Sequence, residues 1–474
     1  MKKLDVIVIG AGAAGLSAAA RLGAAGLSVA LLEARDRVGG RMFTLRDSKC
    51  DAPIELGAEF IHGKPPQTLK LLASRKIPIR EVDGDSWCMQ NGRLSPCNFF
   101  SQVDQILEKM DGRKRDQSFL EFLEKCCSHA GNSRRMREAK RWATGYVSGF
   151  NAADPALVGV HWLVKGMRAE EKIQGERAFR SQNGYADLVG VFKGELEECG
   201  IPIQLDTIVH SIDLSKNHVE IKTGGANGTE VFDAARVLIT VPLGVLQASP
   251  EAKGAIRFCP ELPREKLEPI RNIRMGKVIR VILRFRERFW ARLPKARNKK
   301  SKTLERLSFL LSQDEYFPTW WTTMPEKLPL LVGWAPFRHA EKLSGKTESF
   351  IVEQAIRTLH RLLGVGVSEL EGLLEQAYCH NWQTDPFSRG AYSYGIVGGD
   401  GAERALAKPI DGTLFFAGEA TDTGGHNGTV HGAIASGHRA AAEIIRAADR
   451  SRRSQENVVE QIRRMGPTQP SFSE

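Results

Sequence analysis

The chain has 474 residues, 42% of them hydrophobic and 26% charged, and a formal net charge of +11 at pH 7. This composition is that of an ordinary soluble globular protein, and the length favours two domains over one core. No stretch reaches the roughly 18 uninterrupted apolar residues of a transmembrane helix. The apolar run after Lys2 and Lys3 has no separate cleavage site, so we expect neither a membrane span nor a signal peptide.

The eight cysteines are scattered along the chain, and no two of them form a C-x-x-C pair. This spacing predicts neither a zinc site nor a disulfide framework, and we expect no metal ligands. A reducing, cytoplasmic location is the simplest one for such a chain.

Much of the positive charge lies in two segments, residues 292–306 and the tail over residues 449–474. The tail is polar and lacks periodicity, so we expect it to be disordered. Solvated surface segments are one interpretation of this charge, and weak contact with an acidic partner or a membrane surface is the other. We expect no nucleic-acid partner, and the sequence does not indicate an oligomeric state.

The first 41 residues predict a dinucleotide-binding unit. The apolar, β-branched run Leu4–Ile9 is typical of a buried parallel strand, and a G-x-G-x-x-G sequence follows it directly. Gly10 allows the tight turn, Gly12 allows close approach of a pyrophosphate, and Gly15 allows the helix to pack closely on the strand. The Ala-rich helix that follows presents free N–H groups to the phosphates. Glu33 lies 18 residues after Gly15 and is placed to bind ribose hydroxyls.

The rest of the chain predicts two kinds of segment. Residues 63–180 have the pattern of a helical cap, and residues 256–394 contain a long strand over 273–290 and a helix over 348–363. Residues 181–255 combine a helix with short strands, including separate strands at 230–232 and 236–241, and residues 395–448 end in a strand, Gly418-Glu419 and a helix. We therefore predict an α/β fold. Its Rossmann-type cofactor domain is discontinuous, over 1–62, 181–255 and 395–448, and its α+β substrate-binding domain spans 63–180 and 256–394.

Several blocks of the chain resemble the flavin-containing amine oxidase superfamily, and among its members the polyamine oxidases and lysine-specific histone demethylases. They run from residue 6 to about residue 445. The blocks are G-A-G-A-A-G-L at 10–16, V-G-G-R at 38–41, E-L-G-A-E-F-I-H-G at 55–63, T-V-P-L-G-V-L at 240–246, W-Q-T-D-P-F-S-R-G-A-Y-S-Y at 382–394, F-A-G-E-A-T at 416–421 and T-V-H-G-A at 429–433.

This resemblance implies FAD as the cofactor and assigns the residues that hold it. The ADP half would be held by Gly10, Gly12, Ala13, Ala14, Gly15, Glu33, Ala34, Arg35, Gly39, Gly40 and Arg41. The flavin and the remaining contacts would involve Gly57, Ala58, Glu59, Phe60, the backbone of Val209, Trp382, Gly418, Glu419, Thr429 and Val430.

The resemblance also implies a substrate side. Trp382 and Tyr392 would line the flavin there, although core packing is the alternative for both. His62 falls near the position of the amine, and a structural loop histidine is its alternative. Ala391 occupies the place of the cysteine in the covalent branch, which implies non-covalent FAD. Thr429 stands where that branch has a second tyrosine.

One position departs from the family. A lysine on the long strand usually contacts flavin N5 through water, and the matching residue here is Arg280. Lys277 lies three residues away and would face the opposite side of a regular strand. Arg280 stays protonated and can hold a water or an anion. The alternative is a structural ion pair.

The implied reaction is oxidation of an amine C–N bond, with O2 as the electron acceptor. Trp320 and Trp321 are further candidate walls of the substrate site, or core residues. The stretch 57–62 lacks the arginine of amino-acid oxidases, which favours an amine substrate. Two alternatives stay open: a flavin dehydrogenase or desaturase of an apolar substrate, and a flavin-binding interaction protein.

Overall fold

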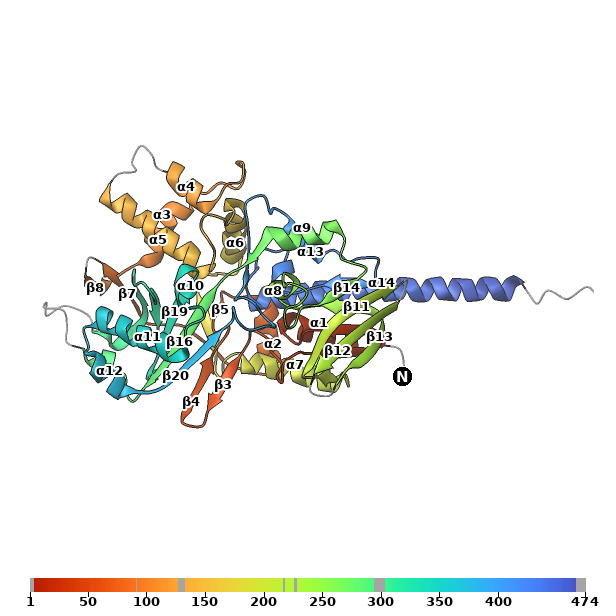
Figure 1. Cartoon of the computed structure of the whole chain (residues 1–474), viewed down its shortest axis with the longest axis horizontal. Coiled ribbons are helices and arrows are strands. Elements are labelled where there is room, and N and C mark those ends of the chain that lie inside the picture. Colours follow the sequence, from red (N-terminus) through yellow and green to blue (C-terminus); the bar gives the residue numbers. More distant parts are fainter. Residues whose placement is uncertain are drawn as a thin grey trace, which may run out of the picture.

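The structure is a computed structural model that describes residues 4–90, 92–126, 133–215, 218–225, 228–293 and 303–465. Two large sheets organise it, and each carries its own helices (Figure 1). Strands of both sheets come from segments that are far apart in the sequence. The predicted α/β fold class is confirmed.

The first sheet has eight strands, and its centre is parallel. β1 pairs in parallel with β2 on one side and β13 on the other. The first half of β13 then pairs with β12, and its last residues pair in parallel with β22. The strands are β1 (Leu4–Ile9), β2 (Val29–Leu32), β10 (Ile203–Gln204), β11 (Thr207–Ser215), β12 (His218–Gly225), β13 (Glu230–Ile239), β14 (Arg257–Cys259) and β22 (Leu414–Phe416).

The prediction of two separate strands at 230–232 and 236–241 is wrong, because β13 is continuous. Ala234 is fully buried and pairs with both Leu4 and Val219, so its small side chain fits between neighbouring strands. Asp233 lies at the exposed end, where its carboxylate is 3.1 Å from His218 Nε2. A small residue and a solvated acid therefore do not interrupt the strand.

Helices α1 and α14 pack together beside the first sheet, with α7 and α2 next to them (Figure 1). One apolar core joins these helices to β1, β2 and β22. Their bounds are α1 (Ala13–Ala24), α2 (Pro66–Ser74), α7 (Ala186–Glu198) and α14 (Val430–Met465). This packing sets the N-termini of α1 and α14 at fixed places beside the strands.

The C-terminal segment differs from the prediction of disorder, because α14 continues through residues 449–465 and projects from the body (Figure 1). Residues 449–465 contain no glycine or proline and many arginines, glutamates and glutamines, which favour helix. The Arg236 guanidinium also donates to Ala447 O and Ser451 Oγ, which holds the start of this extension. Residues 466–474 lie outside the described residues.

The second sheet has seven strands in the order β20-β16-β19-β18-β17-β7-β8. Helices α10 (Arg338–Leu343), α11 (Glu348–Leu363) and α12 (Val367–Leu373) share its core. The strands are β7 (Asp85–Gln90), β8 (Arg93–Pro96), β16 (Val278–Phe285), β17 (Leu307–Leu311), β18 (Thr319–Trp321), β19 (Leu330–Pro336) and β20 (Leu374–Asn381).

The predicted long strand over 273–290 is broken. β15 (Ile273–Met275) pairs with β21 (Ser393–Gly395), and β16 begins only at Val278. Gly276 N donates to Tyr392 O, so the chain changes partner at this glycine. After β16 come the short 3-10 helices η1 (Phe289–Arg292) and η2 (Leu304–Arg306).

The basic segment over 292–306 is described only at its ends. Arg292 pairs with Glu287, and Arg306 pairs with Asp83, both on the surface. Residues 294–302 lie outside the described residues.

The predicted helical cap consists of four helices with a common core. They are α3 (Phe99–Leu107), α4 (Phe119–Lys125), α5 (Arg134–Phe150) and α6 (Val160–Lys172). Beside them, Cys88 and Cys97 form a disulfide across the β7–β8 hairpin. The expectation of no disulfide is therefore corrected, because the hairpin brings together two cysteines whose spacing carried no signal.

Smaller elements connect these parts. Two small sheets are β3 (Thr44–Asp47) with β4 (Cys50–Glu55), and β5 (Ile61–His62) with β9 (Ala178–Ser181) and β6 (Ile79–Glu81). The remaining helices are α8 (Leu243–Leu246), α9 (Arg264–Asn272), α13 (Ala402–Ala407) and η3 (Glu419–Thr421). Within the described ranges, none of the helices has the length and apolar character needed to span a membrane.

Candidate functional site

The glycine loop between β1 and α1 forms a backbone cradle. Gly10 has φ +102, and a Cβ on Gly15 would lie 1.8 Å from Gly10 O, so both positions require glycine. A Cβ on Gly12 would meet no described atom within 4 Å. The first intrahelical bond of α1 runs from Leu16 N to Gly12 O, so the N–H groups of Ala13 and Ala14 precede it. Open space at a helix N-terminus without a side-chain cap suits a phosphate.

Glu33 lies beside this cradle and is 4% exposed. One carboxylate oxygen accepts from Ala11 N at 2.8 Å and the other from Arg35 N at 3.0 Å, across Ala34. Arg35 in turn donates to Asp385 at 2.8 Å. A carboxylate oxygen accepts more than one hydrogen bond, so the predicted contact with ribose hydroxyls fits this position.

Val209 lies on β11, the strand that follows this corner of the sheet. Asp206 N and Thr207 N donate to Arg35 O and Glu33 O, which places the start of β11 against the end of β2. The register of β11 against β12 shifts just after Val209. The backbone at Val209 is therefore near the nucleotide end of the cradle, as its predicted contact with adenine requires.

Arg41 and Glu419 meet at the other end of the cradle. Gly39 N donates to Ala11 O, and a Cβ on Gly40 would lie 3.2 Å from Gly12 Cα, so this turn closes on the glycine loop. Arg41 Nη1 donates to Glu419 at 2.9 Å and to the backbone oxygen of residue 391 at 2.7 Å.

Glu419 also joins two residues that the sequence did not single out. Its second carboxylate oxygen accepts from Ser393 Oγ at 2.6 Å and from Gly428 N at 2.8 Å. The neighbouring Gly418 has φ +123, and its N–H donates to Ser436 on α14. A pocket beside the Arg41–Glu419 pair is lined by the carboxyl ends of β13 and β22, where ligands bind in open α/β sheets.

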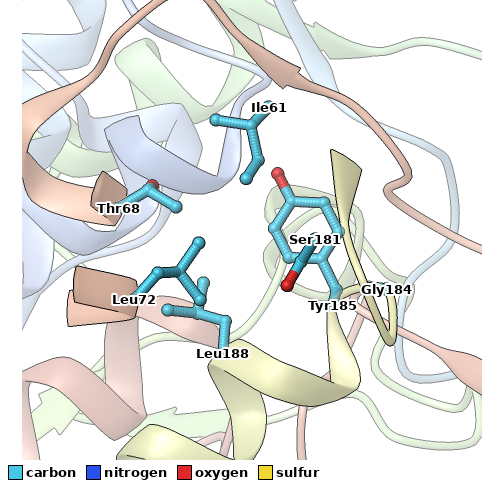
Figure 2. Close-up of a pocket in the computed structure, with 7 residues that line it drawn as sticks. All are labelled: Ile61, Thr68, Leu72, Ser181, Gly184, Tyr185 and Leu188. Atoms are coloured by element: carbon cyan, nitrogen blue, oxygen red, sulfur yellow. The ribbon is translucent and has the colours of Figure 1, made fainter. Parts of the chain in front are cut away.

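The run from Gly57 to Phe60 passes along the turn at Arg41. A Cβ on Gly57 would lie 1.9 Å from Arg41 O, and Ala58 N donates to the same oxygen at 3.0 Å. Behind this run is the apolar pocket between α2, β9 and α7 that Figure 2 shows. The Tyr185 hydroxyl at its edge donates to Phe60 O at 3.0 Å. The pocket therefore supports the run from behind rather than forming the substrate site.

Trp382 lies against the beginning of the same run. It is 4% exposed, its Nε1 donates to Leu56 O at 2.9 Å, and its ring is 3.2 Å from the Cβ position of Gly57. His380 contacts the Trp382 ring edge-on, with centroids 4.2 Å apart. Trp382 thus packs against the start of this run, and its role as a wall of the flavin site stays a prediction.

Arg280 is held in a buried ion pair with Glu59. Its Nη2 pairs with the Glu59 carboxylate, and its Nη1 donates to Gly57 O at 2.7 Å. Burial alone would raise the pKa of Glu59, but Arg280 and Arg180 lower it, and the net shift is downward. Trp321 Nε1 also donates to Glu59, which makes Trp321 part of this network.

The ion-pair alternative for Arg280 therefore describes the observed contacts. Its Nε remains buried without a hydrogen-bond partner among the described residues, so this N–H group is left for a water or a ligand atom. Lys277 is half exposed and pairs with Glu341 at 2.7 Å, outside this network. It does not take the place of the lysine that the family carries.

Tyr392 and Thr429 shape the start of α14. The Tyr392 hydroxyl donates to Phe150 O at 2.7 Å, and its ring lies 3.3 Å from the Cβ position of Gly428. Thr429 Oγ1 accepts from Gly432 N at 3.0 Å, so Thr429 caps α14. The first intrahelical bond runs from Ala433 N to Thr429 O, so the N–H of Val430 precedes it and fits the predicted contact with a flavin oxygen.

His62 lies on β5 within an aromatic group. Its ring is 6.0 Å from Phe60 and 6.1 Å from Phe150, measured between centroids. Burial lowers the pKa of His62, while the Glu170 carboxylate acts in the opposite direction. His62 is therefore neutral at neutral pH.

Four residues near His62 were not singled out from the sequence, although one of them, His431, lies within the block T-V-H-G-A. Tyr146 stacks on Phe150 at 4.8 Å, and burial together with Glu170 raises the pKa of Tyr146 to about 12. His426 and His431 contact each other at 4.7 Å, and burial, then His426 and His62, lower the pKa of His431 to about 3. These side chains come from α5, α6, α14 and the loop before α14, so sequence spacing gives no signal that Tyr146 and Glu170 meet the two histidines. They are Tyr146, Glu170, His426 and His431.

The arrangement fits a dinucleotide that lies along the cradle and ends among aromatic side chains. Glycines and helix N–H groups line one end, and Trp382, Tyr392 and His62 lie toward the other. The chemistry it supports is therefore oxidation or reduction of a molecule bound on the aromatic side.

A family model described as flavin containing amine oxidoreductase matches residues 13–445. Among curated proteins, Lysine-specific histone demethylase 1 homolog 2 of Arabidopsis thaliana is 29% identical over 469 residues, covering 94% of this chain and 59% of the relative. Homolog 1 of the same organism is 30% identical over 474 residues, covering 94% of this chain and 52% of the relative. The chain thus spans little more than half the length of these two relatives.

Two kinds of solved structure have the same fold. Putrescine oxidase bound to putrescine superposes with a TM-score of 0.75 and 21% identity, over 94% of this chain and 99% of that one. Cyclohexylamine oxidase from Brevibacterium oxydans gives a TM-score of 0.74 and 19% identity, over 94% of this chain and 100% of that one.

Proposed function

We propose, from the premise that the chain belongs to the flavin containing amine oxidoreductase family, that it oxidises a C–N bond of an amine. FAD is the cofactor, and it is not covalently attached, since Ala391 provides no thiol beside Tyr392. One observation supports the reaction most. The run from Gly57 to His62 connects the turn at Arg41, beside the glycine cradle, to the aromatic group around His62.

When bound, FAD supplies the acceptor for a hydride equivalent from the α-carbon of the amine. The N–H groups at the start of α1 would bind the pyrophosphate, and Glu33 would bind the ribose. Arg41 donates hydrogen bonds to the Glu419 carboxylate and to the backbone oxygen of residue 391. It would therefore fix the positions of these two segments beside the cofactor. Trp382 and Tyr392 would hold the substrate in line with the flavin.

The aromatic side of the site favours a neutral amine. A protonated amine cannot release hydride, and desolvation between Phe60, Tyr392 and neutral His62 disfavours the charged form. The imine would then hydrolyse to an aldehyde. We propose O2 as the electron acceptor, giving hydrogen peroxide.

A diamine or polyamine is the substrate class that we favour. Glu170 is one-third exposed and acts electrostatically on both His62 and Tyr146. Its carboxylate could pair with the distal ammonium of such a substrate, while the near amine stays neutral among the aromatic rings. A monoamine would lack this second contact.

A second candidate is a flavin dehydrogenase of an apolar substrate. It is favoured by the Arg280–Glu59 pair, because that pair occupies the position from which a lysine usually serves the flavin. Such an enzyme would release no ammonia or shorter amine, and O2 would be a poor acceptor.

We also propose a cytoplasmic location. Among the described residues Cys50, Cys199, Cys259 and Cys379 are free thiols, which supports a reducing cytoplasm, whereas the Cys88–Cys97 disulfide argues against it.

The test is anaerobic loss of the flavin absorbance when the holoenzyme meets a panel of compounds. The panel contains a diamine, a monoamine of equal length, a dimethyl-lysine peptide, an amino acid and an apolar alkene. We expect the diamine to act fastest and to give an aldehyde, and Glu170→Gln to remove its advantage over the monoamine. Reaction with the alkene alone would establish the second candidate instead.

A further inference from the structure

Three metal-binding side chains converge beside the aromatic group, and we infer that Glu170, His426 and His431 form a site for a divalent transition metal of the Zn²⁺ class. One ligand atom from each residue lies within 4.8 Å of the other two. Glu170 comes from α6, His431 from the first turn of α14, and His426 from the loop before it. The sequence predicted no metal ligands, because Glu170 lies far along the chain from His426 and His431.

One ligand–ligand distance at this group matches the spacing in a tetrahedral site. His426 Nδ1 is 3.5 Å from Glu170 Oε1. Two ligands of a tetrahedral zinc lie about 3.4 Å apart when each is about 2.1 Å from the metal. The spacing is thus longer than a good hydrogen bond and suits an ion between the two atoms.

Unsatisfied nitrogens point to a missing partner at this position. His431 is 4% exposed, and its Nε2 is buried without a hydrogen-bond partner among the described residues. His426 Nδ1 is also buried without a hydrogen bond. A buried imidazole nitrogen normally has a partner, and a metal would provide one for both histidines.

The loop that carries His426 is fixed before any ion binds. Asp422 accepts from His426 N and Gly424 N, both at 2.9 Å. His426 O accepts from Thr429 Oγ1 at 2.6 Å, and the Asn427 side chain donates to Glu419 O and Asp422 O. A pre-arranged ligand loses less freedom on metal binding.

The ligand set selects the metal. Two imidazoles and one carboxylate suit Zn²⁺, Co²⁺ or Fe²⁺, whereas Mg²⁺ and Ca²⁺ prefer oxygen ligands. Three protein ligands leave a fourth position for water. A second group, Asp116, His161 and Asp400, differs because both ring nitrogens of His161 already have partners, Asp400 and Lys114 O.

Metal at this site would use the carboxylate that we assign to the distal ammonium of a diamine. Zn²⁺ should therefore compete with a diamine and leave oxidation of a monoamine less affected. This consequence rests on the proposed function, whereas metal binding itself does not.

The direct test is Co²⁺ binding to the full-length holoenzyme after treatment with a chelator. We expect one equivalent of Co²⁺ per chain, with ligand-field absorption at longer wavelength than the flavin, and displacement by Zn²⁺. The variants His426→Gln and His431→Gln should each weaken Co²⁺ binding at least about tenfold. FAD content and thermal stability of each variant show whether it has folded.

His161→Gln is the matched control, and it should bind Co²⁺ as the unmodified chain does. Loss of binding in that variant would place the metal at the second group and overturn the inference. Absence of binding, or binding equally retained in folded His426→Gln and His431→Gln, would also overturn it. Competition between Zn²⁺ and a diamine is measured in a separate experiment. If the chain does not oxidise amines, the Co²⁺-binding result still tests the metal site.

Discussion

The cofactor side and the substrate side of the site are built from different materials. The cradle around Gly10, Gly12 and Gly15 is made of backbone, and its requirements are the absence of side chains and the position of a helix end. The region around Arg280, Glu59 and His62 is made of side chains that meet from distant segments. Backbone sites of the first kind leave a local sequence signature, and side-chain sites of the second kind do not.

The two regions also differ in how they tolerate change. A Cβ added at Gly15 meets a carbonyl oxygen of the same loop, which cannot move without losing the turn. Replacing Arg280 leaves a buried carboxylate whose remaining partners are Arg180 and Trp321. The first change is steric and the second is electrostatic, and the predictions below separate them.

The largest effect is expected for Gly15→Ala. Its Cβ would lie 1.8 Å from Gly10 O, so β1 and α1 must separate, at a cost of about 3 kcal/mol or more and with loss of FAD. Gly190→Ala on α7 is the control, because its Cβ meets nothing within 4 Å and should stabilise the helix by about 0.5–1 kcal/mol. Urea unfolding and FAD content measure both, and full FAD content in Gly15→Ala would contradict the cradle.

Next in size is Arg280→Met, which isolates the Glu59 charge. We expect a loss of about 3–5 kcal/mol in the free energy of unfolding, as for other broken buried ion pairs. Arg284→Met, four residues on along β16, is the control, since its partners Glu375 and Asp47 are 39% and 18% exposed, whereas Glu59 is 6% exposed. Equal losses in the two variants would mean that burial of the pair is not what matters.

The Arg280–Glu59 pair also predicts how the stability of the folded chain changes at acid pH. The pKa of Glu59 is lowered in the folded chain, so its contribution to stability is present above its unfolded pKa. That contribution is lost as the pH falls through the pKa that Glu59 has in the folded chain. Arg280→Met should therefore lose less stability than the unmodified chain when the pH is lowered from 6 to 3.

A smaller pH effect is expected at Glu55, where the two regions meet. It has the opposite sign to that of Glu59, because stability falls as the pH rises. Burial raises the pKa of Glu55 from 4.5 to about 7, and its carboxylate contacts Tyr185 N and Thr44 Oγ1. The folded chain thus binds more protons between these values, so this contribution to stability falls as the pH rises from 4.5 through 7. Glu55→Gln should flatten that slope, and gain on the order of 2 kcal/mol relative to the unmodified chain between pH 5 and pH 8.

The smallest effect is expected for Thr429→Ala, which removes the cap of α14. The bond from Gly432 N to Thr429 Oγ1 would be lost, at a cost of about 1 kcal/mol. Thr429→Ser keeps the hydroxyl and should retain most of the stability. A Thr429→Ser loss as large as that of Thr429→Ala would assign the effect to the methyl group instead.

The parts of the fold that the sequence predicted are those with local patterns. The strand–glycine–helix unit, the cap helices and the helix over Glu348–Leu363 follow from periodicity and turn residues. The continuity of β13, the Cys88–Cys97 bond and the extension of α14 did not follow, because they depend on partners across the fold.

The same division holds for the site. Arg280 was singled out as a departure from a pattern, but its partner Glu59, 221 positions away, could not be identified from spacing. Glu170 and His426 carry no motif, and only the packing of α6 against the loop before α14 brings them together. The roles of individual catalytic residues therefore rest on the resemblance of sequence blocks, whereas the family rests on a match over residues 13–445.

The most direct test of amine oxidation is the deuterium isotope effect on anaerobic flavin reduction. The holoenzyme is mixed with a diamine carrying either hydrogen or deuterium on the α-carbons, and the decay of flavin absorbance is followed in a single turnover. The proposed function predicts reduction by both compounds, with the deuterated one slower because the α C–H bond is broken in this step. Absence of reduction by any amine, while an apolar substrate reduces the flavin, would contradict it.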